Sequence, residues 1–264
     1  MHRRQHASDA HTEEYTLWTV EDGAYSEMYA QEDCHWWFRG RRSLIWALLR
    51  HSRLSDKIRL LDAGCGTGRN LVEFGSFGPA AGVDASPEAV EFCRLRGLEN
   101  VHTGTLDALP FGPGEFDLLL ACDVLEHIDD DLRALIELHR VADRDAYLVI
   151  TVPAYQWMWT EHDVQLHHLR RYTLRTLRSR VLGSGWTIVH DTYFNTILLP
   201  GVVLARLLSR GSSRRGRTDL DRTPAALNGV LALPLQLEAA AIARGARLPA
   251  GTSVGLLCQK VDRS

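Results

Sequence analysis

The stretch LLDAGCGTGRN, residues 60–70, places three glycines within five positions, directly after an apolar run and Asp62. A short apolar run bounded by such a turn is typical of a buried strand. Because glycine has no Cβ, the backbone N–H groups of the turn can approach a ligand closely where the next helix begins. The stretch therefore predicts a ligand-binding turn at the carboxyl end of a strand.

The spacing of these glycines argues against one common ligand. Gly64, Gly66 and Gly68 depart by one position from the GxGxxG fingerprint of dinucleotide-binding proteins, which weakens the case for NAD. Asp84 ends the next apolar run, AAGVD, 22 residues after Asp62. A carboxylate at a strand end can accept hydrogen bonds from both hydroxyls of a ribose. The pattern therefore favours an adenosine-containing ligand.

Short apolar runs alternate with helical segments from residue 58 to 153, as in FDLLLACDVL and AYLVITVP. This alternation predicts a parallel sheet wrapped by helices. Leu106 and Asp107 follow a third short strand, where they could frame an adenine ring, and a fourth strand leads to Cys122 and Asp123. The ends of these strands are thus expected to converge on one site.

The chain divides into five segments by composition and periodicity. Residues 1–14 are polar and predict a disordered tail, and 15–55 predict a helical N-terminal cap. Residues 56–195 form the expected core, 196–250 a helical insertion, and 251–264 the last strand and C-terminus.

Composition excludes several classes of protein. A net charge of −3 over 264 residues gives no global attraction for nucleic acid. The five cysteines form no CxxC pair and no His/Cys spacing typical of a metal site, so we expect no disulfide and no metal. The N-terminus lacks the apolar region of a signal peptide, and no clean stretch reaches transmembrane length, which predicts a cytoplasmic protein.

Four sequence elements, DxGCGxG, VDxS, DALPF and FDxxxxxDVLEH, occur together between residues 60 and 127. With them the chain resembles the class I S-adenosylmethionine-dependent methyltransferases over residues 55–195. Upstream, EDCHWWFRGRR is similar to the HWWFxxRR segment of a bacterial subgroup often associated with glycan or secondary-metabolite genes.

The resemblance implies a Rossmann-like doubly wound α/β fold, whose seven-stranded sheet is parallel except for one antiparallel strand. It implies S-adenosylmethionine as cofactor and S-adenosylhomocysteine as product. The cofactor-binding residues that it implies are Asp62, Gly64, Cys65, Gly66 and Gly68 at the methionine portion, Asp84 and Ala85 at the ribose, Leu106 and Asp107 at the adenine, and Cys122 and Asp123 beside the sulfonium.

Two further groups are candidates for the same site. Trp37 could lie over the cofactor as part of a lid, with Arg39 at its carboxylate, or the segment could be a packed amphipathic helix, which we expect over 41–51. His127, just after the fourth strand, could face the acceptor or the cofactor, or serve structure alone.

Methyl transfer from a sulfonium requires alignment and exclusion of water rather than a metal, together with one base if the acceptor must lose a proton. The segment VPAYQWMWTEHDVQLHHLRRYT, residues 152–173, follows the fifth strand and is rich in aromatic side chains and histidines. His162, beside Asp163, is the first candidate for the base and His167 the second. Alternatively, the tryptophans pack this loop and the histidines cap a helix or bond to the backbone.

The leading hypothesis is a methyltransferase that acts on a hydroxyl of a small-molecule, sugar or natural-product acceptor, with an amine next. A nucleotide-dependent dehydrogenase and a noncatalytic S-adenosylmethionine-binding module are the rival classes. The insertion 196–250 could close over the acceptor, form a homodimer contact, or bind a membrane surface through its arginines, in that order.

Overall fold

The fold is built on one seven-stranded sheet. The computed structural model describes residues 23–55, 57–209, 224 and 227–261, so the expected tail 1–14 lies outside the described residues. The strand order is β3-β2-β1-β4-β5-β7-β6. The strands are β1 (Leu60–Ala63), β2 (Ala80–Asp84), β3 (Val101–Thr103), β4 (Phe116–Cys122), β5 (Ala142–Pro153), β6 (Thr187–Phe194) and β7 (Ser253–Gln259).

The strand directions confirm the expected Rossmann-like architecture. Strands β3, β2, β1, β4 and β5 pair in parallel, and β7 is antiparallel to both of its neighbours, β5 and β6. The chain reverses its strand order after β3, so β1 and β4 lie side by side at the point where the topology switches. In open α/β sheets, ligands bind outside the carboxyl ends of the strands at such a point.

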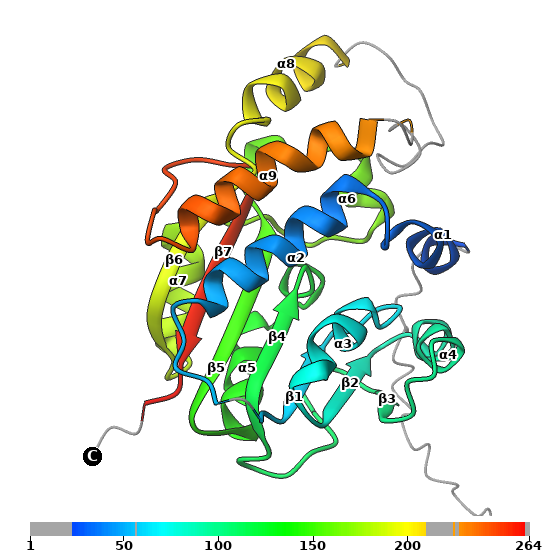
Figure 1. The fold of residues 1–264 in the computed structure, drawn as a ribbon, viewed down its shortest axis with the longest axis vertical. Coiled ribbons are helices and arrows are strands. Elements are labelled where there is room, and N and C mark those ends of the chain that lie inside the picture. Colours follow the sequence, from blue (N-terminus) through cyan, green and yellow to red (C-terminus); the bar gives the residue numbers. More distant parts are fainter. Residues whose placement is uncertain (1–22, 56, 210–223, 225–226, 262–264) are drawn as a thin grey trace, which may run out of the picture.

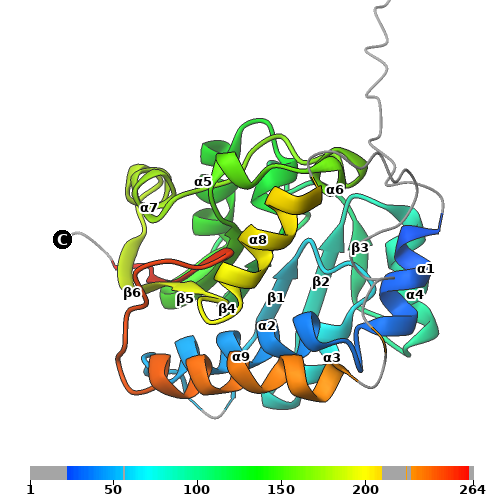
Figure 2. The same ribbon diagram turned by 90° about the horizontal axis from the view of Figure 1, so that it is seen from above.

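Helices cover both faces of the sheet (Figures 1 and 2). One face carries α5 (Asp131–Val141) and α7 (Leu174–Gly183), and the opposite face carries α2 (Trp36–Leu49), α3 (Arg69–Phe74) and α9 (Asn228–Ile242). Both faces of β4 are therefore buried, which explains why the run FDLLLAC is apolar apart from Asp117, near the start of the strand. Leu118 and Leu120 pack on the α2 side, whereas Leu119 and Ala121 pack on the α5 side.

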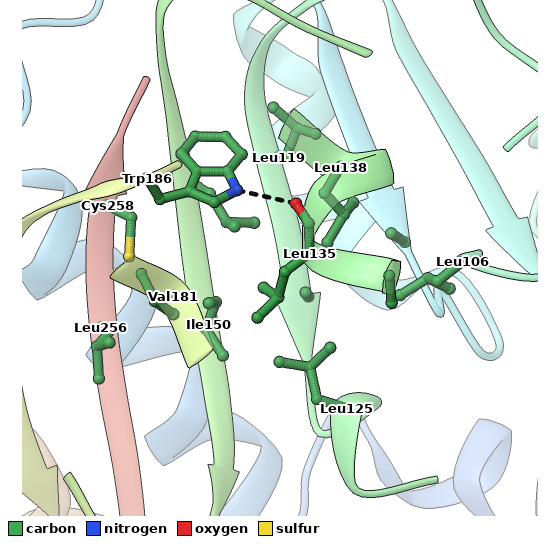
Figure 3. Close-up of a cluster of buried hydrophobic side chains, with 14 of the residues drawn as sticks. Leu106, Leu119, Leu125, Leu135, Leu138, Ile150, Val181, Trp186, Leu256 and Cys258 are labelled. Carbon is green, nitrogen blue, oxygen red and sulfur yellow. Dashed lines mark hydrogen bonds between the residues drawn. The ribbon is translucent and has the colours of Figure 1, made fainter. Parts of the chain in front are cut away.

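The core on the α5 side is closed by one large aromatic side chain. Trp186 is fully buried, and its indole N–H donates a hydrogen bond of 3.1 Å to the backbone oxygen of Leu135 (Figure 3). The bond satisfies the only polar atom of that side chain. It also ties the segment before β6 to α5.

The N-terminal cap consists of α1 (Ala24–Gln31) and α2. The second helix begins at Trp36, five residues before the helix expected over 41–51, and ends at Leu49. His35 explains the earlier start, because its ring accepts a hydrogen bond from the backbone N–H of Trp37 and so caps the helix. The aromatic segment at 36–38 is therefore the first turn of this helix.

Segment 196–250 contains α8 (Leu199–Ser209) and α9, and α9 lies along α2 (Figure 1). The two helices approach closely at Gly40, where a Cβ would lie only 2.0 Å from Cδ2 of the buried Leu235. None of the helices in the described ranges combines the length and the apolar composition needed to cross a bilayer.

Candidate functional site

The glycine turn connects β1 to α3 and adopts a conformation that excludes other residues. Gly64, Gly66 and Gly68 have φ values of 78°, 53° and 84°. A Cβ on Gly64 would lie 2.5 Å from Val124, and one on Gly68 would lie 2.5 Å from Leu98. The turn therefore requires glycine both for its left-handed backbone and for its close packing. Cys65, within the turn, is buried and contacts Cys93 through sulfur.

Asp62 lies at the end of β1 with its side chain fully buried. Neither carboxylate oxygen has a hydrogen-bond partner within the described chain, although Asn70 and Arg41 lie near enough to favour its charged form. Burial nevertheless dominates and raises the pKa of Asp62 to about 7. Buried oxygens without partners are costly, so this carboxylate fits a ligand that brings a hydrogen-bond donor or a positive charge.

Asp84 ends β2 and faces the same turn. Its Oδ2 accepts a hydrogen bond of 2.8 Å from the backbone N–H of Gly66, and its Oδ1 accepts one of 2.9 Å from Ser86. Burial raises the pKa of this carboxyl group. Ala85, between Asp84 and Ser86, is exposed. Asp84 is thus held in one orientation at the carboxyl end of β2.

Helix α1 covers this part of the site. The hydroxyl of Tyr25 donates a hydrogen bond of 3.4 Å to Oδ1 of Asp84, and burial together with Asp84 raises the pKa of Tyr25. Met28 lies over the glycine turn, because a Cβ on Gly66 would sit 3.3 Å from its sulfur. The side chain of Glu32, directly after α1, forms an ion pair with Arg96 and accepts a hydrogen bond from the hydroxyl of Thr67 in the glycine turn. Sequence reasoning missed Tyr25, whose contact with Asp84 spans 59 positions of the chain.

The structure places the expected adenine-side residues in the loop after β3. Leu106 is 5% exposed and packs in the core on the α5 side, and Asp107 is half-buried. The loop follows Thr103, which pairs with Asp84 in the parallel register of β2 and β3. The segment and the ribose-side carboxylate therefore lie at the same edge of the sheet.

Asp123 follows β4 and brings an arginine into the site. Its Oδ2 lies 2.8 Å from Nη1 of Arg41, and its Oδ1 accepts a hydrogen bond of 3.2 Å from Thr151. Its φ of 54° turns the chain sharply at the strand end. Cys122, one residue earlier, is buried, and burial raises the pKa of its thiol.

The arginine in this pair, Arg41, is not the one that we expected in the site, which was Arg39. Arg39 is exposed, whereas the Arg41 side chain is only 14% exposed and acts electrostatically on Asp62 as well as Asp123. Two residues along a helix differ by about 200° in direction, so only one of these arginines can face the sheet. Trp37 lies one turn before Arg41, half-buried and edge-on to Trp36. Helical phase measured from Trp37 could have identified Arg41 from the sequence.

The loop after β5 contains η3 (Gln156–Met158) and the short helix α6 (Glu161–Gln165). Asp163 is completely buried, with Arg171 at 2.7 Å and the Nδ1 atom of His168 at 2.9 Å from its Oδ1. It also accepts a hydrogen bond of 2.7 Å from the backbone of Thr160 and completes the capping box of α6. These donors hold its pKa well below the usual range, despite its burial.

Asp163 was expected to act beside His162 by raising the basicity of that imidazole, but its carboxylate pairs with Arg171 and His168 and anchors the loop. His162 and His167 are both half-buried. His167 has a φ of 54°, at the point where the chain leaves α6. Whether either histidine acts as a base stays a prediction.

His127 ends η2 (Leu125–His127), directly after Asp123 and Val124. Its ring meets that of His168 edge to face at 4.7 Å between centroids, and burial together with this neighbour lowers the pKa of His127 to about 4. Glu126 is 1% exposed. Ligand atoms of Glu126, His127 and His168 all lie within 4.8 Å of one another. Spacing rules missed this group because its members come from two segments.

The comparisons with known proteins concern this same part of the chain. Residues 61–150 match the family described as "Methyltransferase domain". Over 108 residues the chain is 31% identical to the ubiquinone/menaquinone biosynthesis C-methyltransferase UbiE of Citrifermentans bemidjiense, a match that covers 37% of this chain and 46% of the relative. Over 128 residues it is 33% identical to the magnesium-protoporphyrin O-methyltransferase of Rhodobacter capsulatus, covering 40% and 54%.

The chain thus spans about half the length of these curated relatives. Among solved structures, an S-adenosylmethionine-dependent methyltransferase from Thermotoga maritima shares the fold with a TM-score of 0.53 and 18% identity, covering 90% of this chain and 99% of that chain. The matched range 61–150 includes Asp62, Asp84 and Asp123. It does not reach the HWWF segment at 35–38, so that subgroup stays a prediction.

Proposed function

Residues 61–150 match the family described as "Methyltransferase domain", and from this premise we propose that the chain is a class I S-adenosylmethionine-dependent methyltransferase that transfers a methyl group to a hydroxyl of a small-molecule, sugar or natural-product acceptor. One observation carries the proposal. The glycine turn after β1 holds the backbone N–H of Gly66 against Asp84, with the buried Asp62 at its start. We further propose that residues 56–195 and 251–264 form the core, capped by 15–55 and 196–250.

The family implies S-adenosylmethionine as cofactor, and the residues of the glycine turn suit it. Asp62 offers two buried oxygens without partners to the ammonium group of the methionine portion. Asp84 offers its carboxylate to the ribose hydroxyls, provided that the hydroxyl of Tyr25 gives way. The loop at Leu106 and Asp107 would frame the adenine, and Cys122 would line the wall beside the sulfur.

The cofactor supplies a methyl group that its positively charged sulfur already activates for displacement. The protein then has to align the acceptor, exclude water and remove one proton. The loop from 152 to 173 supports a hydroxyl acceptor, because it brings His162 and His167 to the carboxyl end of β5. Asp163 anchors this loop, because it ties α6 to Arg171.

An amine acceptor is the alternative within the same chemistry. The two curated relatives are named for methylation of carbon and of oxygen, so relatedness does not select the acceptor atom. The alternative that involves no catalysis is a protein module that binds S-adenosylmethionine without transferring its methyl group. The contact of Tyr25 with Asp84 supports this alternative, because a ligand that binds Asp84 would displace Tyr25 and could thereby change the position of α1.

Titration calorimetry with S-adenosylmethionine and S-adenosylhomocysteine tests the proposal, with NAD as the negative control. We expect saturable binding of both sulfur compounds, at least about tenfold weaker in Asp84→Ala because the ribose hydroxyls lose a charged acceptor. Glu91→Ala, an exposed carboxylate on α4 (Pro87–Leu95), is the matched control and should bind normally. Binding of NAD in preference would contradict the proposal.

A second measurement separates enzyme from binding module. Release of S-adenosylhomocysteine is followed over a panel of hydroxyl-bearing and amine-bearing acceptors. Turnover with hydroxyl acceptors supports the proposal, turnover confined to amines replaces it with the first alternative, and binding without turnover on any acceptor favours the module.

A further inference from the structure

The group formed by Glu126, His127 and His168 is the most concentrated set of potential metal ligands in the described chain. Glu126 and His127 belong to η2 after β4, and His168 comes from the segment after α6. One ligand atom from each lies within 4.8 Å of the other two. We propose that these three residues, the His2Glu cluster, bind a divalent transition-metal ion beside the methyl-transfer site.

Both histidines are oriented as metal ligands usually are. The Nδ1 atom of His168 lies 2.9 Å from the Asp163 carboxylate, which leaves Nε2 as the ring nitrogen for a ligand. The backbone of Leu166 lies near enough to the ring of His127 to favour a proton on that ring. In metal sites, the second ring nitrogen of each histidine is typically held by a carboxylate or a carbonyl group, which fixes the tautomer and the ring direction.

Glu126 gives the independent indication of a ligand. Its side chain is 1% exposed, and its Oε2 has no hydrogen-bond partner among the described residues. The nearby arginines are already bound elsewhere, Arg41 by Asp123 and Arg171 by Asp163. Leaving a buried carboxylate oxygen without a partner is costly, and a cation at the His2Glu cluster removes that cost.

The donor set defines the class of ion. Two imidazole nitrogens and one carboxylate suit Zn²⁺, Co²⁺, Mn²⁺ or Fe²⁺ better than Mg²⁺ or Ca²⁺, which prefer oxygen ligands alone. Ligand atoms around one Zn²⁺ ion lie about 3.4 Å apart, because each is about 2.1 Å from the metal. Side-chain rotations that move each ligand atom by about 1 Å therefore bring the three atoms to the separation found around one ion. Three protein ligands leave a coordination position open.

The open position has a chemical consequence that rests on the proposed function. A hydroxyl group coordinated there loses its proton to water more readily than in solution. Its oxygen then bonds to the methyl carbon while the carbon–sulfur bond breaks, and both electrons of that bond stay on sulfur to give the thioether. The sequence expectation was a site without metal, since spacing rules do not detect ligands 41 residues apart.

Cobalt is the probe that tests the site without any methyl donor or acceptor. The full chain is freed of metal with EDTA, desalted and titrated with Co²⁺, and visible absorption and calorimetry report the binding. We expect one equivalent to bind with d–d bands typical of nitrogen and oxygen ligands, and Zn²⁺ to displace it. Glu126→Gln should weaken binding at least about tenfold, and His127→Ala and His168→Ala more.

Two controls keep the test decisive. A variant in which His2, His6 and His11 are all alanine removes histidines outside the described residues, and His102→Ala removes an exposed one on β3. Both should bind cobalt as the wild type does. Glu126→Gln is nearly isosteric, so its effect is interpretable even if a histidine variant unfolds, and Zn²⁺ should raise the melting temperature of the wild type by more than that of this variant.

The proposal is overturned if no equivalent binds, or if the N-terminal triple variant loses cobalt while Glu126→Gln retains it. Failure of the proposed function shows instead in the titration with S-adenosylmethionine, in which metal plays no part. The metal site and the proposed function are therefore tested by independent measurements.

Discussion

The hydroxyl of Tyr25 donates a hydrogen bond of 3.4 Å to Oδ1 of Asp84, so helix α1 meets β2 at the carboxylate that we assign to the ribose. The ribose hydroxyls and the tyrosine therefore compete for one acceptor. Gly66 and Ser86 already occupy that carboxylate through their backbone N–H groups, which limits the positions left for a third and fourth donor.

Replacing Tyr25 by phenylalanine should tighten the binding of S-adenosylmethionine by about fivefold. The ring and its packing remain, and only a hydrogen bond worth about 1 kcal/mol that the ligand must displace is removed. Calorimetric titration measures the change. Tyr29→Phe is the matched control, because Tyr29 lies on the same helix but packs on Phe92. Weaker binding in Tyr25→Phe would show that the hydroxyl contacts the ligand instead of competing with it.

Arg41→Met should lower the free energy of unfolding by about 2–4 kcal/mol. The substitution leaves Asp123 without its charged partner in a largely buried place, and removing one member of such a pair is costly. Arg39→Met, two residues away and exposed, should change the stability by less than about 0.5 kcal/mol. Urea unfolding followed by circular dichroism compares the two. Equal effects would mean that Arg41 is not paired in solution.

The glycine turn, Asp84 and the parallel sheet could be predicted because each depends on a local pattern. The close spacing of Gly64, Gly66 and Gly68 predicts a tight turn, and all three have positive φ, while the alternation of short apolar runs with helices predicts the sheet. The choice between Arg39 and Arg41 needed the phase of α2, which the cap at His35 sets.

Two contacts lay beyond any local pattern. Tyr25 reaches Asp84 across 59 positions, and His168 reaches His127 only because β4 and the loop after β5 end beside each other. The role of Asp163 also depended on this packing. Its carboxylate pairs with Arg171 and His168, and neither residue is adjacent to Asp163 in the sequence.

Gly40→Ala should destabilise the protein by about 2–3 kcal/mol, because the added methyl group would lie 2.0 Å from the buried Leu235 on α9. Combining it with Leu235→Ala should restore part of that loss, which a double-mutant cycle measures as coupling. Gly229→Ala, at a helical position with open space around it, should instead stabilise by about 0.5–1 kcal/mol. An uncoupled pair would mean that α9 does not pack on α2 in solution.

His162→Ala should leave the dissociation constant of S-adenosylmethionine unchanged and slow methyl transfer by about 100-fold, if this histidine removes the acceptor proton. Single-turnover kinetics with an acceptor from the panel separate binding from transfer. His102→Ala, exposed on β3, serves as the control. An unchanged rate in His162→Ala would direct attention to His167 or to the His2Glu cluster.

Asp62 makes stability depend on pH in a direction opposite to that of most carboxylates. An unfolded aspartate ionises near pH 3.9, whereas burial raises the pKa of Asp62 in the folded state to about 7. Between these values the folded protein binds a proton that the unfolded chain has lost, so the stability contributed by Asp62 falls as pH rises and is constant above about pH 7.

Asp62→Asn removes this titration and nearly preserves shape. We therefore expect the variant to be about as stable as the wild type at pH 4 and more stable than it at pH 8, by up to about 4 kcal/mol. Urea unfolding at both pH values gives the difference in the free energy of unfolding between variant and wild type. The contributions of all other titrating groups cancel in that difference. A variant less stable than the wild type at pH 8 would show that Arg41 and Asn70 already stabilise the carboxylate. Saturating S-adenosylmethionine should narrow the gap at pH 8, because its ammonium group pairs with the charged Asp62 but not with an amide.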